Sequence, residues 1–435
     1  MNTKLAVEER SQHRTTAETD KYGNVIDPIV RYARGSILQG TDEEVRRMLR
    51  ARHLVGALVR SKGTESIYDL SGMNRGSGIT LEDVPHLTTH VPFFAYFEGK
   101  TEPLALRHMG ADRSRHGALI LNRVSAANFI ALTTLVGKGD RVYAFAPGGG
   151  ATHPSAARPI AMAGAELREF HSYADLASAW SAGAPRLLLI TPISASKRHI
   201  PFAEFQQALA LPRAANTLVY VDDAHMASRI AFFDEPPAFK VGDIDLAVCS
   251  ADKHVAGPRA GIMVGRSDLI TLVGSRAYEL GLEAQAGQYV GVANALRNFD
   301  PRAVKDAGEL AKELLEVLAA KYGAERAYLG GPGVSLSGEH VLEIAVQRQS
   351  RRERPYLVAV EAAGLVAMEM LEHDGVLTIG AVSMPGSAPA VRLMMYPDGR
   401  RLGIERIVSA LEHGIDRLSE AIYDVDSARR QLLGD

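Results

Sequence analysis

Between residues 118 and 265 the sequence alternates short apolar runs with segments of helical periodicity. Strands are expected at 118–121, 141–147, 165–170, 186–193, 217–222 and 244–249, with helices at 125–136, 155–164, 173–183 and 202–211 between them. Strands that alternate with helices pair in parallel, because each helix carries the chain back to the same end of the sheet. The pattern therefore predicts an α/β fold with a mostly parallel central sheet.

Polar side chains follow several of these apolar runs directly. They are Ser125, His153, Ser194, Asp222 and His225. Ligands of open α/β sheets bind at the carboxyl ends of the strands. A helix that begins there, as at Ser125, adds free N–H groups and a positive dipole end, which together favour an anion. We therefore expect these residues to share one site.

A lysine at one strand end and an acid at another suggest the chemistry of that site. Lys253 follows the apolar run 244–249 and precedes a turn containing Gly257 and Gly261, a setting that suits an amine condensing with an aldehyde. Asp222 ends the run 217–222. A carboxylate that keeps a pyridine nitrogen protonated makes pyridoxal phosphate (PLP) an electron sink. The pair favours a PLP site with Lys253 as Schiff base, although an exposed surface lysine is the alternative for Lys253 alone.

The composition excludes several classes of partner. Lys and Arg number 49 against 51 Asp and Glu, so no strong field favours nucleic acid or a membrane surface. The single cysteine, Cys249, fits a reducing compartment such as the cytoplasm and is expected to be a packed, inert thiol. No apolar stretch reaches membrane-spanning length, and no metal ligands are predicted.

The flanking segments predict two further parts of the chain. Residues 1–95 are expected to form an arm followed by a helix at about 42–61, which begins with a capping box between Thr41 and Glu44. Residues 96–298 would be the large PLP-binding domain, and residues 299–435 a smaller α/β domain. In the latter we predict strands at Val341–Val346 and Val391–Met395 and a final helix at Ile404–Ile422.

Five short motifs, in this order, resemble those of fold-type I PLP-dependent enzymes, in particular serine hydroxymethyltransferase and its aldolase-like relatives. They are Ser125-Ala126-Ala127-Asn128, residues 149–155, Ile193-Ser194-Ala195-Ser196, Val221-Asp222-Asp223-Ala224-His225 and Gln285-Ala286-Gly287. The segment from Asp252-Lys253 to Gly257-Pro258-Arg259-Ala260-Gly261 also resembles bacterial selenocysteine synthase and its ammonia-lyase relatives. The resemblance implies a fold-type I transferase fold and a homodimer.

The resemblance also implies a role for each site residue. Lys253 would carry PLP, Asp222 would pair with the ring nitrogen, and His153 would stack on the ring, while His225 and Ser194 would lie near the phenolic oxygen. Ser125 and the N–H of Ala126 would hold the phosphate, with Ser250 as a further candidate, and Gly287 would approach the phosphate from the partner subunit. Arg392 would bind the substrate carboxylate. Alternatives stay open: His153 as a helix cap, His225 as a core histidine, and Arg400 or Arg401 in place of Arg392.

The reaction implied is cleavage or formation of the Cα–Cβ bond of a small amino acid, as in an aldolase or hydroxymethyltransferase. An elimination-type lyase, a selenocysteine synthase-like transferase and an aminotransferase are alternatives, because the same cofactor serves them all. From another class, the chain would be a PLP-free binding protein that keeps the fold.

Overall fold

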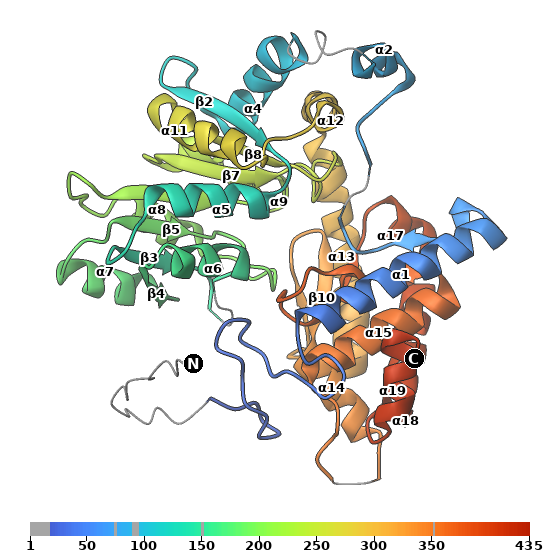
Figure 1. The fold of residues 1–435 in the computed structure, drawn as a ribbon. Helices are drawn as coiled ribbons and strands as arrows, with labels where there is room; N and C mark the ends of the chain where they lie inside the picture. The colour runs from blue at the N-terminus through green and yellow to red at the C-terminus, as the bar shows by residue number, and fades with distance from the viewer. Residues whose placement is uncertain (1–17, 74–75, 89–94, 149–151, 351–352) are drawn as a thin grey trace, which may run out of the picture.

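The chain is built around a seven-stranded sheet, seen in the upper left of Figure 1. The computed structural model describes residues 18–73, 76–88, 95–148, 152–350 and 353–435. In spatial order the strands are β2 (His116–Leu121), β8 (Gly261–Arg266), β7 (Leu246–Ser250), β6 (Leu218–Asp222), β5 (Leu187–Ile190), β3 (Arg141–Phe145) and β4 (Glu166–Phe170). The strands from β7 to β4 pair in parallel, and β8 runs antiparallel to both of its neighbours. The predicted mostly parallel sheet is confirmed.

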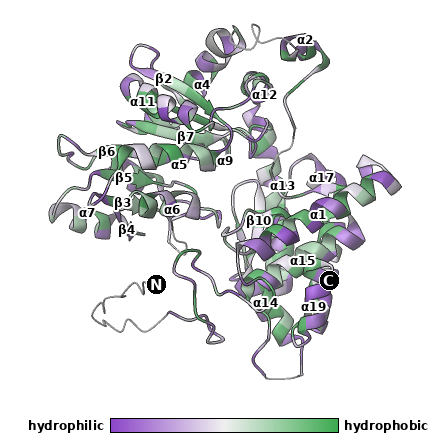
Figure 2. Ribbon diagram, in the orientation of Figure 1, coloured by the Kyte–Doolittle hydropathy of each residue, from purple (hydrophilic) through white to green (hydrophobic). Residues whose placement is uncertain are grey.

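Helices cover both faces of this sheet. One layer contains α5 (Val124–Leu135), α6 (Pro154–Met162) and α11 (Ser267–Glu279), and the other contains α4 (Glu102–Met109), α7 (Tyr173–Ser181), α8 (Phe202–Leu209), α9 (Met226–Phe232) and α12 (Ala286–Arg297). Along β6, Tyr220 packs in the first layer, whereas Val219 and Val221 pack in the second, since successive side chains point to opposite faces. Burial on both faces explains the continuous apolar runs, which are green on the strands in Figure 2.

A second, smaller α/β unit follows the long helix α13 (Pro301–Tyr322). Its antiparallel sheet has the order β12 (Ala390–Met394), β10 (Gly333–Ser337) and β9 (Ala327–Leu329). Its helices are α14 (Gly338–Gln347), α15 (Ala359–Asp374), α16 (Ile379–Val382), α17 (Pro397–Leu402), α18 (Ile404–Ala421) and α19 (Val425–Leu433). The strand predicted at 391–395 and the helix predicted at 404–422 correspond to β12 and α18, but the helix is not the final one, because α19 follows it.

The N-terminal segment packs on this smaller unit. Helix α1 (Thr41–Lys62) contacts α15 and α16, and β1 (Tyr68–Asp69) pairs in parallel with β11 (Val376–Leu377). The buried carboxylate of Glu361 accepts hydrogen bonds from the backbone N–H groups of Ile37 and Leu38 at 2.7 and 2.9 Å. The remaining short helices include α2 (Val84–Leu87) and α10 (Ala238–Val241).

Two local predictions are wrong. Residues 341–346 form part of α14 and not a strand, because the buried Gly338, Val341, Leu342 and Ala345 recur at helical spacing and Ser337 caps the helix at the N–H of His340. The strand lies just before it, as β10.

The capping box predicted between Thr41 and Glu44 is also absent from α1. The N-cap of α1 is Gly40, which makes no side-chain cap. The buried Glu44 carboxylate instead accepts a hydrogen bond from the Tyr32 hydroxyl at 2.9 Å and pairs with Arg34. Two cationic or hydroxyl donors hold a carboxylate more strongly than one backbone N–H.

Two expectations from composition can be compared with the structure. Cys249 is buried in β7, and burial raises the pKa of its thiol, so the predicted packed thiol is confirmed. Across the described ranges, no helix combines the length and apolar character that crossing a membrane requires.

Candidate active site

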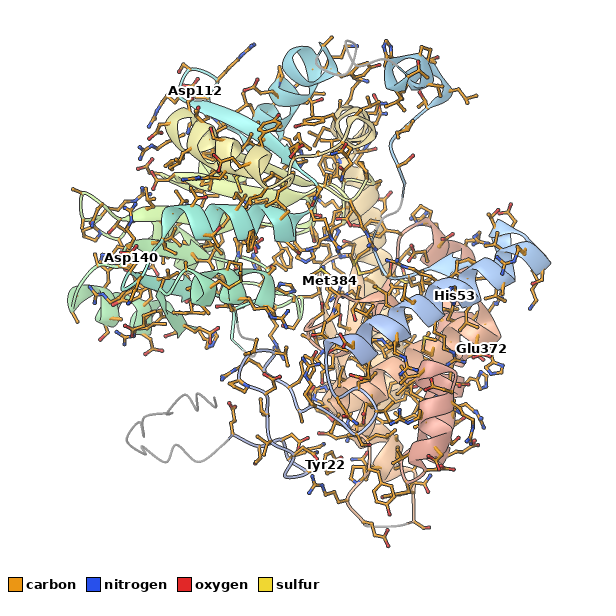
Figure 3. The ribbon with its side chains drawn as sticks, viewed as in Figure 1. Tyr22, His53, Asp112, Asp140, Glu372 and Met384 are labelled. Carbon is orange, nitrogen blue, oxygen red and sulfur yellow. The ribbon has the colours of Figure 1, made fainter. Side chains whose placement is uncertain are left out.

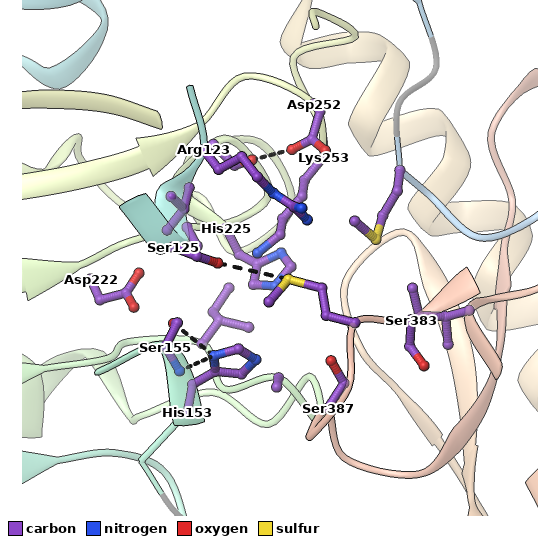
Figure 4. A pocket seen from close by; sticks show the side chains of 18 of the residues that line it. Arg123, Ser125, His153, Ser155, Asp222, His225, Asp252, Lys253, Ser383 and Ser387 are labelled. Carbon is purple, nitrogen blue, oxygen red and sulfur yellow. Dashed lines mark hydrogen bonds between the residues drawn. The ribbon is translucent and has the colours of Figure 1, made fainter. Parts of the chain in front are cut away.

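A cavity lies where the carboxyl ends of β6 and β7 meet the N-terminus of α5 and the 379–392 segment of the smaller unit. Figure 4 shows its side chains from both units. Predicted site residues on its wall are Ser125, His153, Asp222, His225, Ser250, Lys253 and Arg392. The cavity therefore brings together predicted site residues that are up to 267 positions apart in the sequence, from Ser125 to Arg392.

Asp222 is the acid at the end of β6. Its Oδ2 accepts a hydrogen bond from Asn128 Nδ2 at 2.8 Å, and the Tyr220 hydroxyl in turn donates to Asn128 Oδ1 at 2.5 Å. The other oxygen, Oδ1, is buried and makes no hydrogen bond within the described residues. Burial raises the pKa of Asp222, against the opposing effects of the Asn128 side chain, Lys253 and the backbone N–H of Ala224. The site thus holds a carboxylate with one oxygen fixed and one oxygen left for a donor.

Lys253 lies on the same cavity wall, in the loop after β7. The loop is closed by hydrogen bonds from Ala251 N to Ala260 O at 3.0 Å and from Gly257 N to Ala251 O at 2.8 Å. Ala256 has a φ of 63°, a conformation that costs energy for a residue with a Cβ. Burial lowers the pKa of the Lys253 amine. A larger neutral fraction makes the amine a better nucleophile.

The N-terminus of α5 forms a cationic corner of the cavity. Arg123 is its N-cap, Ser125 lies in the first turn, and the first intrahelical bond begins at Ala127 N. Gly261 permits this approach, because a Cβ there would lie 2.8 Å from Arg123 O. Arg259 completes the corner, with its Nε 3.8 Å from an Asp252 oxygen. Guanidinium groups beside free helix N–H groups are suited to an anion.

His153 caps α6 through its ring. Nδ1 accepts from Ser155 N at 3.2 Å and lies 2.7 Å from Ser155 Oγ, and in Figure 4 the ring extends from Ser155 into the cavity. Burial lowers the pKa of His153 to about 4, with smaller contributions from Lys253 and Arg158. The ring is therefore neutral at pH 7, and with Nδ1 as acceptor its proton is on Nε2. His153 therefore caps α6 through Nδ1 and also lines the cavity.

A buried network lies behind His225. Lys197 Nζ is 2.7 Å from His225 Nδ1, the same Nδ1 is 2.9 Å from His254 Nε2, and His254 Nδ1 is 2.5 Å from the Tyr396 hydroxyl. Burial, and then Lys197, lower the pKa of His225 well below its usual value. Lys197 itself has a φ of 67°. This network fixes the position of His225 and keeps its ring neutral.

Arg392, in β12, is the cationic side chain that the smaller unit contributes to the cavity wall. Nη2 donates to Ala195 O at 2.7 Å, and Nε makes no hydrogen bond to any described part of the chain. Burial lowers the pKa of Arg392 to about 10, so the guanidinium is still cationic at pH 7. No ion pair joins it to a carboxylate in the ranges that the structure describes. A buried cation of this kind requires an anion.

Three predicted residues lie elsewhere. Ala126 is in the first turn of α5 beside Ser125 but does not line the cavity. Ser194 lines a neighbouring cavity that shares His153 and Ala195 with the first, and its Oγ contacts Ser196 Oγ at 2.8 Å. Gly287 is the second residue of α12 and is not on the cavity wall.

The sequence assigned no role to Arg123 and Arg259, which form the cationic corner, or to three residues that act through other side chains. Asn128 ends the motif Ser125-Ala126-Ala127-Asn128, His254 adjoins Lys253, and Lys197 follows directly after the Ile193–Ser196 motif. Position beside a recognised motif was the available signal for each. Their contacts, however, join residues between 28 and 142 positions apart, which no local pattern contains.

The chain is similar to several known proteins. It is 28% identical over 400 residues to the UPF0425 pyridoxal phosphate-dependent protein of Methanothermobacter thermautotrophicus, covering 92% of this chain and 100% of that one. A protein of the same name from Methanosphaera stadtmanae is 28% identical over 388 residues, which covers 89% of this chain and 97% of the relative. No family model matches the sequence.

Solved structures share the architecture. A putative aminotransferase from Silicibacter pomeroyi has a TM-score of 0.55 at 17% identity, covering 95% of this chain and 99% of its own. Sphingomonas wittichii serine palmitoyltransferase has a TM-score of 0.54 at 15% identity, covering 86% and 84%. The chain has the fold of the fold-type I PLP enzymes. The predicted fold class is confirmed. The SepCysS–SepCysE N-terminal domain complex also matches, with a TM-score of 0.54 at 12% identity over 83% of this chain and 99% of that one.

Proposed function

We propose that this chain is a PLP-dependent enzyme that acts on a small amino acid. The observation that carries the proposal is the buried, unpaired Oδ1 of Asp222 on the same cavity wall as the Lys253 amine. A pyridinium N–H satisfies such an oxygen, and an amine of lowered pKa condenses with an aldehyde. The fold and the names of the sequence relatives support the same cofactor.

The chain offers a partner for each part of the cofactor. Lys253 would hold the aldehyde carbon and Asp222 the ring nitrogen. Ser125, Arg123 and the first-turn N–H groups of α5, including that of Ala126, would hold the phosphate, with Ser250 nearby. When bound, PLP supplies an electron sink for a bond broken at Cα. The protein's part is to keep the ring nitrogen charged and the substrate oriented.

The substrate's carboxylate is assigned to Arg392. Its guanidinium is buried, cationic at pH 7 and held in place by the bond from Nη2 to Ala195 O. A planar fork binds a carboxylate through two parallel hydrogen bonds, and Nε is still without a partner in the described residues. Arg400 and Arg401 lie in α17, where Arg401 pairs with Asp398, and neither lines the cavity.

Within this class we propose cleavage or formation of the Cα–Cβ bond. His153 is neutral at pH 7 and carries its proton on Nε2, so it can donate a hydrogen bond to an oxygen at Cβ where charge develops. β-Elimination of a group that leaves as a stable anion, and transamination, do not need such a donor at Cβ, so this donor favours the Cα–Cβ reaction. The elimination-type lyase and the aminotransferase are therefore the second candidates.

The tests begin with the cofactor. PLP-loaded protein should absorb near the visible edge, and borohydride reduction should attach the cofactor to the peptide containing Lys253. Lys253→Ala should lose both signals. A protein that stays colourless when saturated with PLP contradicts the proposal, and one that binds PLP through Lys253 but turns over no amino acid supports the binding-protein alternative.

Product analysis then tests the reaction. With β-hydroxy amino acids we expect an aldehyde and glycine. A keto acid with ammonia identifies elimination, and a keto acid with an aminated cofactor identifies transamination.

We also propose that the enzyme is a homodimer. Gly287 is near the start of α12, where a Cβ would meet Ile79 at 3.5 Å, and Ile79 is 37% exposed. Nearby in the sequence, Leu81 is 90% and Val84 45% exposed. The exposed Ile79 beside Gly287, with two more exposed apolar side chains close to it in the sequence, suits an interface through which Gly287 would reach the partner's phosphate. Analytical ultracentrifugation of the PLP-loaded chain tests this, and a monomer at micromolar concentration overturns it.

A further inference from the structure

A second cluster of ligand side chains lies away from the cavity. Glu369 and His373 are one turn apart on α15, and His413 faces them from α18. One ligand atom from each lies within 4.8 Å of the other two. In Figure 3, Glu372 marks this end of α15 on the outer side of the smaller unit, whereas Met384 marks the cavity. None of the three residues belongs to the site already described.

The spacing of two of these atoms matches a tetrahedral metal site. His373 Nε2 is 3.3 Å from Glu369 Oε2. Zinc bonds of about 2.0–2.1 Å at a tetrahedral angle place neighbouring ligand atoms about 3.3 Å apart. Glu369 Oε2 is buried and has no hydrogen-bond partner in the described ranges, and its side chain is 4% exposed. An imidazole nitrogen and a carboxylate oxygen that approach without a hydrogen bond are placed as two ligands would be.

The third ligand has a supporting carboxylate. Asp374, the last residue of α15, has its Oδ2 3.4 Å from His413 Nδ1. Histidines that bind zinc commonly donate their other ring N–H to a carboxylate, which orients the ring. With Nδ1 directed to Asp374, Nε2 is the nitrogen of His413 available to an ion.

We propose that Glu369, His373 and His413 bind a divalent cation of the zinc type, with water as a fourth ligand. Two imidazoles and one carboxylate are a donor set that zinc accepts. The side chains of His373 and His413 are 52% and 39% exposed, so an ion can enter from solvent. The ion would join α15 to α18. This proposal does not depend on the PLP chemistry.

Arg417 is a cation close to the proposed metal site, so its removal tests whether Glu369 binds a metal ion. Its Nε is 3.7 Å from Glu369 Oε2, and it also pairs with Glu420. A cation beside the carboxylate opposes a metal ion there. Arg417→Gln should therefore tighten zinc binding several-fold, whereas it should leave zinc binding unchanged if Glu369 only forms ion pairs with His373 and Arg417.

The test is a calorimetric titration of the chelator-treated, PLP-loaded full chain with Zn²⁺ alone. We expect a saturable site that is weakened about a hundredfold or more in His413→Ala and in His373→Ala, and about 10–100-fold in Asp374→Asn. His373 is half exposed, so its variant is expected to fold even if Glu369→Gln does not. His53→Ala, an exposed histidine on α1, is the matched control and should bind as the wild type does.

Either of two results would overturn the proposed site. These are the absence of saturable binding, or equal zinc affinity in wild type, His413→Ala and His373→Ala. Amino-acid turnover measured on the same samples separates this outcome from the proposed function: the variants should keep wild-type turnover whether or not they bind zinc.

Discussion

The support that Asn128 gives to Asp222 offers a sharp test of the site. Asn128→Leu conserves approximate volume but removes the donor 2.8 Å from Asp222 Oδ2 and the acceptor 2.5 Å from the Tyr220 hydroxyl. Both groups are buried, so water cannot replace the lost partner. The hydrogen bond from Asn128 lowers the pKa of Asp222, and its loss therefore favours the neutral carboxyl.

The size of the effect follows from these two contacts. A hydrogen bond to a charged group contributes about 1.5–3 kcal/mol, and a buried polar group left unpaired costs about 1–3 kcal/mol. Because the ionised carboxylate is a much stronger acceptor for a protonated ring nitrogen than the neutral carboxyl group, the loss should weaken PLP binding about tenfold to a hundredfold, at 1.4 kcal/mol per factor of ten. The free energy of unfolding of the PLP-free protein should fall by about 2–6 kcal/mol, the sum for two unpaired groups.

The assay is a fluorescence titration of PLP-free protein with PLP, accompanied by urea unfolding. Tyr220→Phe is the control, because it removes one bond to Asn128 but keeps the donor to Asp222. We expect Tyr220→Phe to lose about 1 kcal/mol of stability with its PLP affinity nearly unchanged. If Asn128→Leu binds PLP as tightly as the wild type, Asp222 does not hold the ring nitrogen in the way we propose.

Three further predictions concern single residues. Because burial raises the pKa of Asp222, the ionised carboxylate destabilises the PLP-free fold as pH rises through that pKa. Asp222→Asn should therefore stabilise the PLP-free protein by about 0.5–2 kcal/mol at pH 7, measured by urea unfolding. The same variant should lose tight PLP binding in a titration. Lys197→Met removes an amine that lowers the pKa of His225, so the acid limb of the pH–rate profile should move to higher pH; an unmoved limb contradicts the coupling. Glu361→Gln places an NH₂ group against the N–H of Val358, and urea unfolding should show a loss of about 1–3 kcal/mol without a change in PLP affinity.

The sheet could be predicted because each of its strands and helices is recognisable from the pattern of its own residues. Strands such as β6 and β7 are buried on both faces and read as apolar runs, and the helices between them show their own period. The smaller unit was harder. Its strand β10 has the sequence Gly-Val-Ser-Leu-Ser, which is short and half polar, so the apolar pattern predicts a strand in the following segment, which forms α14. Antiparallel pairing with β12, 53 or more residues away, stabilises β10.

The site was predictable where chemistry is tied to a strand end. Strand ends predict Asp222, Lys253 and His153 as site residues, and the structure places all three on the wall of one cavity. Residues that act through another side chain were missed: Asn128 is mid-helix, and Lys197 is 28 residues from His225. A buried lysine and a buried asparagine show no sequence pattern of their own, since their partners are brought to them only by the sheet order.

Buried polar atoms without hydrogen-bond partners in the cavity wall link the stability of the free protein to ligand binding. Asp222 Oδ1, Arg392 Nε and Arg259 Nε are all buried without a hydrogen-bond partner among the described residues, and all three residues line the same cavity. Each such atom costs about 1–3 kcal/mol, so the unliganded site is destabilising by several kcal/mol. One acceptor and two cationic donors are the complement of a ligand set with a protonated ring nitrogen and two anionic groups. Binding energy would then offset the cost, and the groups that destabilise the free protein would be the ones that hold cofactor and substrate in place.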